Sequence, residues 1–269
     1  MDIAALIPAI IMGLVEGLTE FLPVSSTGHL ILMGDLLGFQ EPPGKTFEIA
    51  IQLGAILAVI WAYRADLVTI LLGMWRPRTA ERFVAMNIIL AFLPALVLGA
   101  TLHGIITNLL FNAWVVSWAL VLGGIALIVI ERRRPKATIP TIAEIGPLSA
   151  VIVGFGQVLA MIPGTSRSGA TIIMALLLGV ERRAAAEFSF LLAIPTMLAA
   201  TVFSLWKARN ELAGGDLTQI GVGFVVAFVV ALLVVKALLR IITRTGFEPF
   251  GWYRIALGTV MLVWLYLRG

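Results

Sequence analysis

A short stretch near the start of the chain, residues 16–29, gathers several side chains that can do chemistry. Glu16 and Glu20 are four residues apart, so on a helix their carboxylates lie on one face. Pro23 interrupts that helix, and hydroxyl-bearing residues follow where a second helix would begin. These hydroxyls and the imidazole after them belong to Ser25, Ser26, Thr27 and His29. Ionisable groups in such apolar surroundings usually mark a functional site.

A second stretch, residues 163–171, again places hydroxyls after a proline and adds a cation, Arg167. The guanidinium group of Arg167 offers a fork of N–H donors that matches phosphate oxygens. Two helices beginning at these two places would direct N–H groups and positive dipole ends at one point, which favours an anion such as phosphate. The other candidate binding residues here are Thr165, Ser166, Ser168 and Thr171.

The carboxylates of Glu16 and Glu20 would repel a phosphate unless something offsets their charge. A divalent cation, Mg²⁺ or Ca²⁺, held by both glutamates and by phosphate oxygens would do so. Alternatively, one glutamate is protonated and acts as an acid. Ser26 and His29 suggest a nucleophile and its base, with a helix N-cap as the alternative role for the serine and an activated water as the alternative nucleophile.

The elements that must position these groups are membrane helices. The chain has 269 residues, of which 60% are hydrophobic and 13% charged, with a mean hydropathy of +1.04. Soluble domains carry about 25% charged residues, so the composition excludes that class. Apolar runs of spanning length occur at about 47–63, 83–102, 113–131, 186–206, 219–240 and 250–267. We therefore expect an all-α polytopic membrane protein with about six transmembrane helices, formed as a single domain over residues 1–269.

Four further apolar runs, about 3–21, 26–38, 145–161 and 168–179, are too short or interrupted to span. They form two pairs, each broken at a proline and a hydroxyl-rich turn, which predicts two re-entrant helical hairpins. A constant shift along the sequence pairs Gly13 with Gly154, Glu16 with Gln157 and Gly28 with Gly169. We expect two repeats, about 1–131 and 141–269. Each has three spans, so the second is inverted and the hairpin tips meet near the midplane, as in transporters.

Basic residues set the expected orientation. Threading the six spans puts most lysines and arginines on one face, with Arg254 counted among them, and that face is cytoplasmic by the positive-inside rule. The net charge of +4 is therefore attributed to membrane flanks, and we expect no nucleic-acid partner. The sequence lacks cysteine, which excludes disulfides, thiolate ligands and a cysteine nucleophile.

Five segments together resemble the undecaprenyl-diphosphate phosphatase family (UppP/BacA), nearly from end to end. They are EGLTEFLPVSSTGHL (16–30), TFEIAIQLGAILAV (46–59), PGTSRSGAT (163–171), EFSFLLAIP (187–195) and PFGWYR (249–254). The resemblance implies a hydrolase of the bacterial inner membrane that removes one phosphate from undecaprenyl diphosphate and so regenerates the carrier lipid of peptidoglycan synthesis. It also implies a link to bacitracin resistance, a divalent-cation requirement and a site reached from the periplasmic side.

The same resemblance implies roles for individual residues. The catalytic group would be Glu16, Glu20, Ser26, His29 and Arg167, and the phosphate-binding neighbours would be Ser25, Thr27, Ser166, Ser168 and Thr171. The expected partners are a prenyl diphosphate substrate and membrane lipids, and a homodimer is compatible with the sequence. The alternative function, favoured by the inverted repeat alone, is a transporter or flippase of a phosphorylated lipid or another anionic substrate.

Overall fold

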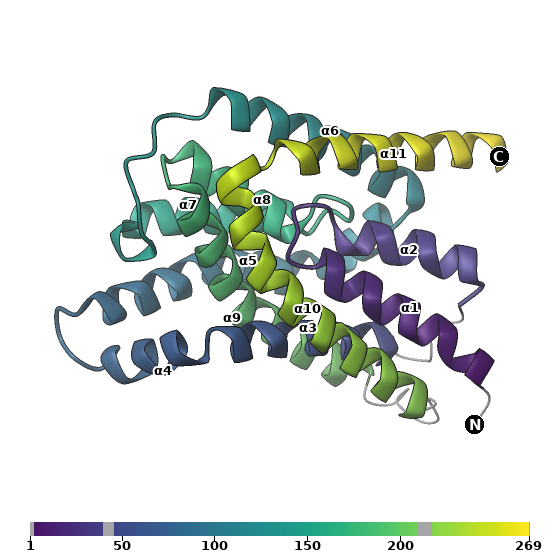
Figure 1. Cartoon of the computed structure of the whole chain (residues 1–269), viewed down its shortest axis with the longest axis horizontal. Helices are drawn as coiled ribbons and strands as arrows, with labels where there is room; N and C mark the ends of the chain where they lie inside the picture. Colours follow the sequence, from purple (N-terminus) through teal and green to yellow (C-terminus); the bar gives the residue numbers. More distant parts are fainter. Residues whose placement is uncertain (1–2, 40–45, 209–216, 269) are drawn as a thin grey trace.

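Long apolar helices dominate the structure, a computed structural model that describes residues 3–39, 46–208 and 217–268 (Figure 1). The helices are α1 (Ile3–Thr19), α2 (Ser26–Leu37), α3 (Thr46–Ala62), α4 (Arg64–Gly73), α5 (Ala80–Leu110), α6 (Ala113–Arg133), the short 3₁₀ helix η2 (Ile142–Glu144), α7 (Pro147–Leu159), α8 (Arg167–Leu177), α9 (Arg182–Ala208), α10 (Leu217–Thr245) and α11 (Glu248–Arg268). Within the described ranges, five helices are long and apolar enough to cross a membrane, or six if α3 and α4 count as one span. The all-α polytopic fold is confirmed.

The first expected span, about 47–63, differs most from expectation. Helix α3 has the predicted limits, but the chain then bends by 73° into α4 instead of entering a loop. Tyr63 stands at the break. The long helices still expose large apolar side chains, among them Leu122, Leu233 and Val260. In water such exposure would be costly, whereas lipid acyl chains accept it.

Two short helix pairs, α1 with α2 and α7 with α8, occupy the places predicted for the hairpins. Their turns have closely similar geometry. Ser25 and Ser166, related by the constant sequence shift, have φ angles of 70° and 73°. Each is the N-cap of the next helix and accepts a bond from the backbone N–H of a glycine, Gly28 or Gly169. A positive φ is strained for serine, and such strain concentrates at functional sites.

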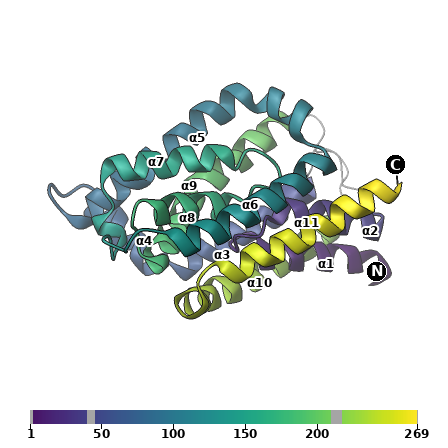
Figure 2. The same cartoon turned by 90° about the horizontal axis from the view of Figure 1, so that it is seen from above.

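The first helix of each hairpin packs against a long helix from the other half of the chain. Helix α1 lies along α10, and α7 lies along α5, on opposite sides of the molecule (Figure 2). Both contacts are close because a glycine faces the partner's backbone: Gly13 lies against Gly223 and Gly154 against Ala91. With each hairpin packed against a helix of the other half of the chain, the two hairpin tips lie in the interior and face each other.

Candidate active site at the hairpin tips

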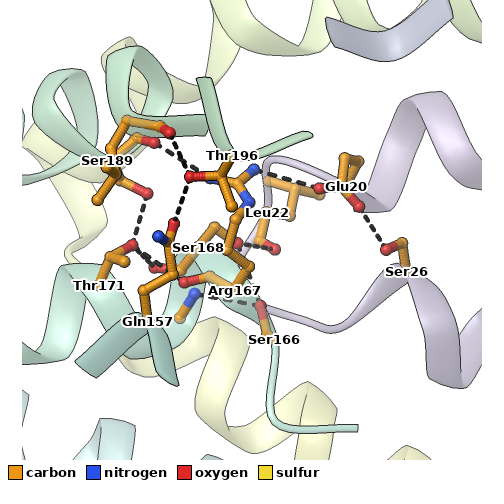
Figure 3. A network of polar contacts seen from close by, with 12 residues as sticks. Glu20, Leu22, Ser26, Gln157, Ser166, Arg167, Ser168, Thr171, Ser189 and Thr196 are labelled. Carbon is orange, nitrogen blue, oxygen red and sulfur yellow. Dashed lines mark hydrogen bonds and ion pairs between the residues drawn. The ribbon is translucent and has the colours of Figure 1, made fainter. Parts of the chain in front are cut away.

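Glu20 joins the two tips. One of its carboxylate oxygens, Oε1, accepts a bond from Arg167 Nη2 at 3.2 Å, and the other, Oε2, accepts a bond from Ser26 Oγ at 2.5 Å (Figure 3). A second bond crosses between the tips, from Ser168 Oγ to the carbonyl oxygen of Leu22 at 2.8 Å. Residues about 140 positions apart in the sequence thus form one polar cluster. This agrees with the prediction that the tips of the two hairpins meet.

A cavity of about 360 Å³ opens beside this cluster. Its polar end is lined by Glu20, Ser25, Ser26, Thr27, Gln52, Gln157, Ser166, Arg167 and Thr196. Its other wall is apolar and includes Phe92, Leu96, Gly99, Met161, Ala200 and Phe203, from α5, α9 and the end of the first arm of the second hairpin. A pocket with a few convergent polar groups at one end of an apolar wall suits an amphiphilic ligand with a polar head.

The polar end of this cavity combines features that favour an anion with the carboxylate of Glu20, which is paired to Arg167. Helix α2 begins at Ser26 and α8 begins at Arg167, and both of these residues line the cavity. The N-terminal ends of the two helices, which are the positive ends of their dipoles, therefore lie at the cavity, and the side chain of Arg167 lies there too. The side chain of Arg167 is only 12% exposed. A hydrogen bond from its Nη1 to the carbonyl oxygen of Ser189, at 3.1 Å, helps to hold it in place. An anionic head placed here would meet preorganised donors.

His29 and Glu16 lie behind the cavity wall and do not line it. His29 Nδ1 lies 2.7 Å from the carbonyl oxygen of Ser25, so this nitrogen carries a proton and donates it. His29 Nε2 lies 2.6 Å from the hydroxyl of Tyr253. Both imidazole nitrogens are therefore engaged, and the structure does not bring Ser26 and His29 together as a nucleophile and base. Ser26 bonds to Glu20 instead.

Three predicted binding residues of the second tip also lie outside the cavity lining. Ser168 is fully buried and bonds to Leu22, and Thr171 Oγ1 lies 2.7 Å from Ser189 Oγ. Thr165 contributes its carbonyl oxygen, which accepts a bond from Arg254 at 2.8 Å. These residues support the tip, whereas Ser166 and Arg167 reach the cavity.

The burial of Arg254 shows that counting this residue among the basic residues of the cytoplasmic face was wrong. It is 1% exposed, so it is not a basic flank at the cytoplasmic face. Its guanidinium lies between the two tips and α6, and donates to carbonyl oxygens of all three. The sequence analysis missed it because an arginine at the end of an apolar run is typical of a flank.

The site also contains polar residues that the sequence analysis did not select for binding. Gln52, Gln157 and Thr196 line the cavity, and Thr196 Oγ1 lies 3.3 Å from Gln157 Oε1. The signal that would have found them is a polar residue within an otherwise apolar helix.

The donor set at the tips fits a hard divalent cation. Glu20 presents a carboxylate at the cavity, and the Oε1 atom of Glu16 is buried without a hydrogen-bond partner among the described residues. Within that same part of the chain, no cluster of three or more His, Cys, Asp or Glu side chains is present. Mg²⁺ in proteins is commonly held by one or two carboxylates together with substrate phosphates, and of the two glutamates Glu20 lies at the cavity where a phosphate would bind.

Fold and site together define a polytopic membrane protein in which two hairpin tips meet at a polar cluster beside a cavity. The sequence matches the family described as bacitracin resistance protein BacA over residues 9–260, and the chain belongs to this family. It is 51% identical to undecaprenyl-diphosphatase 2 of Paramagnetospirillum magneticum, over 98% of this chain and 100% of that one. It is 53% identical to the undecaprenyl-diphosphatase of Methylococcus capsulatus, over 94% of this chain and 93% of that one.

Proposed function

We propose that the protein hydrolyses undecaprenyl diphosphate to undecaprenyl phosphate and inorganic phosphate. The observation that carries this proposal is the meeting of two hairpin tips, with Arg167 paired to Glu20, at the polar end of a cavity with an apolar wall. The relatives that match almost the whole chain are undecaprenyl-diphosphatases, which supports the same substrate. This activity recycles the carrier lipid for peptidoglycan synthesis, and release of the carrier from the diphosphate form accounts for a role in bacitracin resistance.

The substrate binds with its diphosphate at the tips. Arg167, the hydroxyl of Thr27 and the N-terminal N–H groups of α2 and α8 hold the phosphate oxygens. The first isoprene units of the tail lie along the apolar wall formed by Phe92, Leu96 and Phe203. Because the guanidinium of Arg167 already lies in the site, its charge is available as negative charge develops on the transferring phosphoryl group.

Ser26 is the favoured nucleophile, with Glu20 as its base. The Ser26 hydroxyl already donates to Glu20 Oε2, so attack of Oγ on the terminal phosphorus transfers that proton to the carboxylate. The bond between the terminal phosphorus and the bridging oxygen breaks, and undecaprenyl phosphate leaves. A water then attacks the phosphoserine, inorganic phosphate departs, and the Ser26 oxygen regains a proton. In the alternative route a water activated by Glu20 attacks directly, and Ser26 only orients the carboxylate.

A divalent cation is part of the proposal. Glu20 and Glu16 would hold it, and it would neutralise charge on the phosphate oxygens as the anhydride bond breaks. Glu20 keeps its contact with Arg167 through the oxygen that does not face Ser26.

The proposal includes an inverted repeat with its site open to the periplasmic side of the bacterial inner membrane. The matching N-caps at Ser25 and Ser166, and the matching glycine contacts of Gly13 and Gly154, support the repeat. With Arg254 removed from the count, the other basic residues still favour a cytoplasmic location for the ends of α6 and α10. The homodimer stays a prediction.

Phosphate release from undecaprenyl diphosphate by the protein purified in detergent tests the function directly. No transport can occur without a sealed membrane, so release of one phosphate per lipid supports the hydrolase and disfavours the transporter. Absence of release at any divalent-cation concentration, from a protein that melts cooperatively, would contradict the proposal.

A further inference from the structure

Arg254 on α11 holds the backbone of both tips at once. Its Nη1 donates to Pro23 O at 3.3 Å in the first tip and to Thr165 O at 2.8 Å in the second. Its Nη2 donates to Gly164 O at 3.0 Å. The remaining bonds, from Nε and Nη2, go to the carbonyl oxygens of Leu120 and Ala119 on α6 at 3.3 and 3.0 Å. All five N–H donors of the guanidinium are therefore spent on carbonyl groups.

Tyr253, which precedes Arg254 in the chain, contacts the first tip through His29. Its hydroxyl bonds to His29 Nε2, and His29 Nδ1 donates to the carbonyl oxygen of Ser25. The two rings are parallel, with centroids 5.5 Å apart. Tyr253 itself is 48% exposed, so this contact lies at the edge of the fold and little of the core depends on it.

We propose that Tyr253 and Arg254 form a brace that positions the catalytic groups of both tips. The tip carbonyl groups that they hold, directly or through His29, belong to residues one to three positions before Ser26 or Arg167 in the chain. In each tip the strained serine, Ser25 or Ser166, lies beside these carbonyls. The brace thus fixes the nucleophile, Ser26, and the phosphate-binding guanidinium of Arg167 relative to each other, although neither brace residue lines the cavity.

Buried carbonyl groups in a turn have no helix partner and need a donor from elsewhere. A lysine in place of Arg254 would keep the charge, but its three donors cannot serve five carbonyl groups and lack the rigid fork. The tips would then settle into slightly different positions, and a misplacement of about 1 Å at a reacting centre can cost 10²-fold in rate.

The experiment measures kcat, KM and thermal melting for R254K and Y253F with undecaprenyl diphosphate in detergent, and so rests on the proposed function. We expect kcat to fall about 10²-fold in R254K and about tenfold in Y253F, with KM within about threefold of wild type. Y253F should melt within a few degrees of wild type, whereas R254K should melt lower because its three donors leave at least two of the five carbonyl groups unpaired. Arg268 and Tyr266, near the lipid-exposed end of the same helix, provide the matched controls R268K and Y266F, which should keep the wild-type kcat.

Guanidinium ion separates positioning from a merely structural role. In R254A the vacated space adjoins Gly164, which lines the cavity, so added guanidinium can enter it. We expect guanidinium, but not an equal concentration of sodium ion, to raise kcat of R254A at temperatures well below the melting temperature of this variant. Wild-type kcat in both R254K and Y253F, or kcat losses that only follow losses of melting temperature and resist guanidinium, would overturn the brace. If the wild-type protein itself releases no phosphate, the proposed function fails and the brace fails with it.

Discussion

Gly123 on α6 leaves the space that the guanidinium of Arg254 occupies, so adding one methyl group there should destabilise the protein. A Cβ atom at Gly123 would overlap Arg254 Nη2 and lie 2.8 Å from Cζ. A flexible arginine would move aside, but this guanidinium is held by five hydrogen bonds and is 1% exposed. The substitution Gly123→Ala therefore has to break some of these bonds.

The expected magnitude comes from the two bonds of Nη2, to Ala119 and Gly164. A hydrogen bond to a charged group contributes about 1.5–3 kcal/mol, so losing both costs about 3–6 kcal/mol of unfolding free energy. That loss is comparable with the total stability of many proteins, about 5–15 kcal/mol. We therefore expect a fall in melting temperature well beyond that of ordinary surface substitutions.

The assay is thermal or detergent-induced unfolding of the purified protein, with Gly221→Ala as the matched control. Gly221 also lies inside a long apolar helix, α10, but nothing would lie within 4 Å of an added Cβ atom there. Alanine should be neutral or stabilising at that position, by up to about 1 kcal/mol. If Gly123→Ala unfolds at the same point as Gly221→Ala, the packing of Arg254 against α6 is wrong.

Three further predictions concern the site itself. Removal of divalent cations with a chelator should abolish phosphate release, and Mg²⁺ or Ca²⁺ should restore it with a higher half-saturating concentration in Glu16→Gln; full activity in the chelator would exclude the cation site. Replacing Ala200 in the apolar wall with phenylalanine should raise KM for the long undecaprenyl substrate more than for farnesyl diphosphate, and equal effects would place the tail elsewhere. Ser26→Ala should lower kcat by at least 10³-fold if Ser26 is the nucleophile, whereas substantial residual turnover would favour the activated water.

Much of the architecture follows from local sequence signals. A span needs about 20 apolar residues, and run length together with the proline-containing turns that interrupt the hairpins separates the spanning helices from the hairpin arms. Pro23 and Pro163, each followed by hydroxyl-bearing residues, mark the turns, and the structure places helix starts at Ser26 and Arg167. The meeting of Glu20 with Arg167 is what the predicted inverted repeat would produce, because an inverted order of the spans brings one tip from each side.

Other features depend on contacts that no local pattern encodes. The burial of Arg254 requires Gly123 on α6 and carbonyl groups from two distant turns, so its sequence neighbours cannot reveal it. The bond between His29 and Tyr253 joins residues 224 positions apart, and it removes the imidazole from the role of base that its spacing from Ser26 suggests. The bend after α3 was missed because the polar residues that follow Tyr63 are typical of a loop.

The central claim is that two tips from opposite halves of the chain form one catalytic unit. The most direct test is a double-mutant cycle of kcat for phosphate release, with Ser26→Ala in the first tip and Arg167→Met in the second. Residues that act as a unit give strongly non-additive effects. We predict that the double variant is no more than about threefold slower than the slower single variant. Losses that multiply, so that the double variant falls by the product of the two single effects, would show that the tips act independently and would contradict the account.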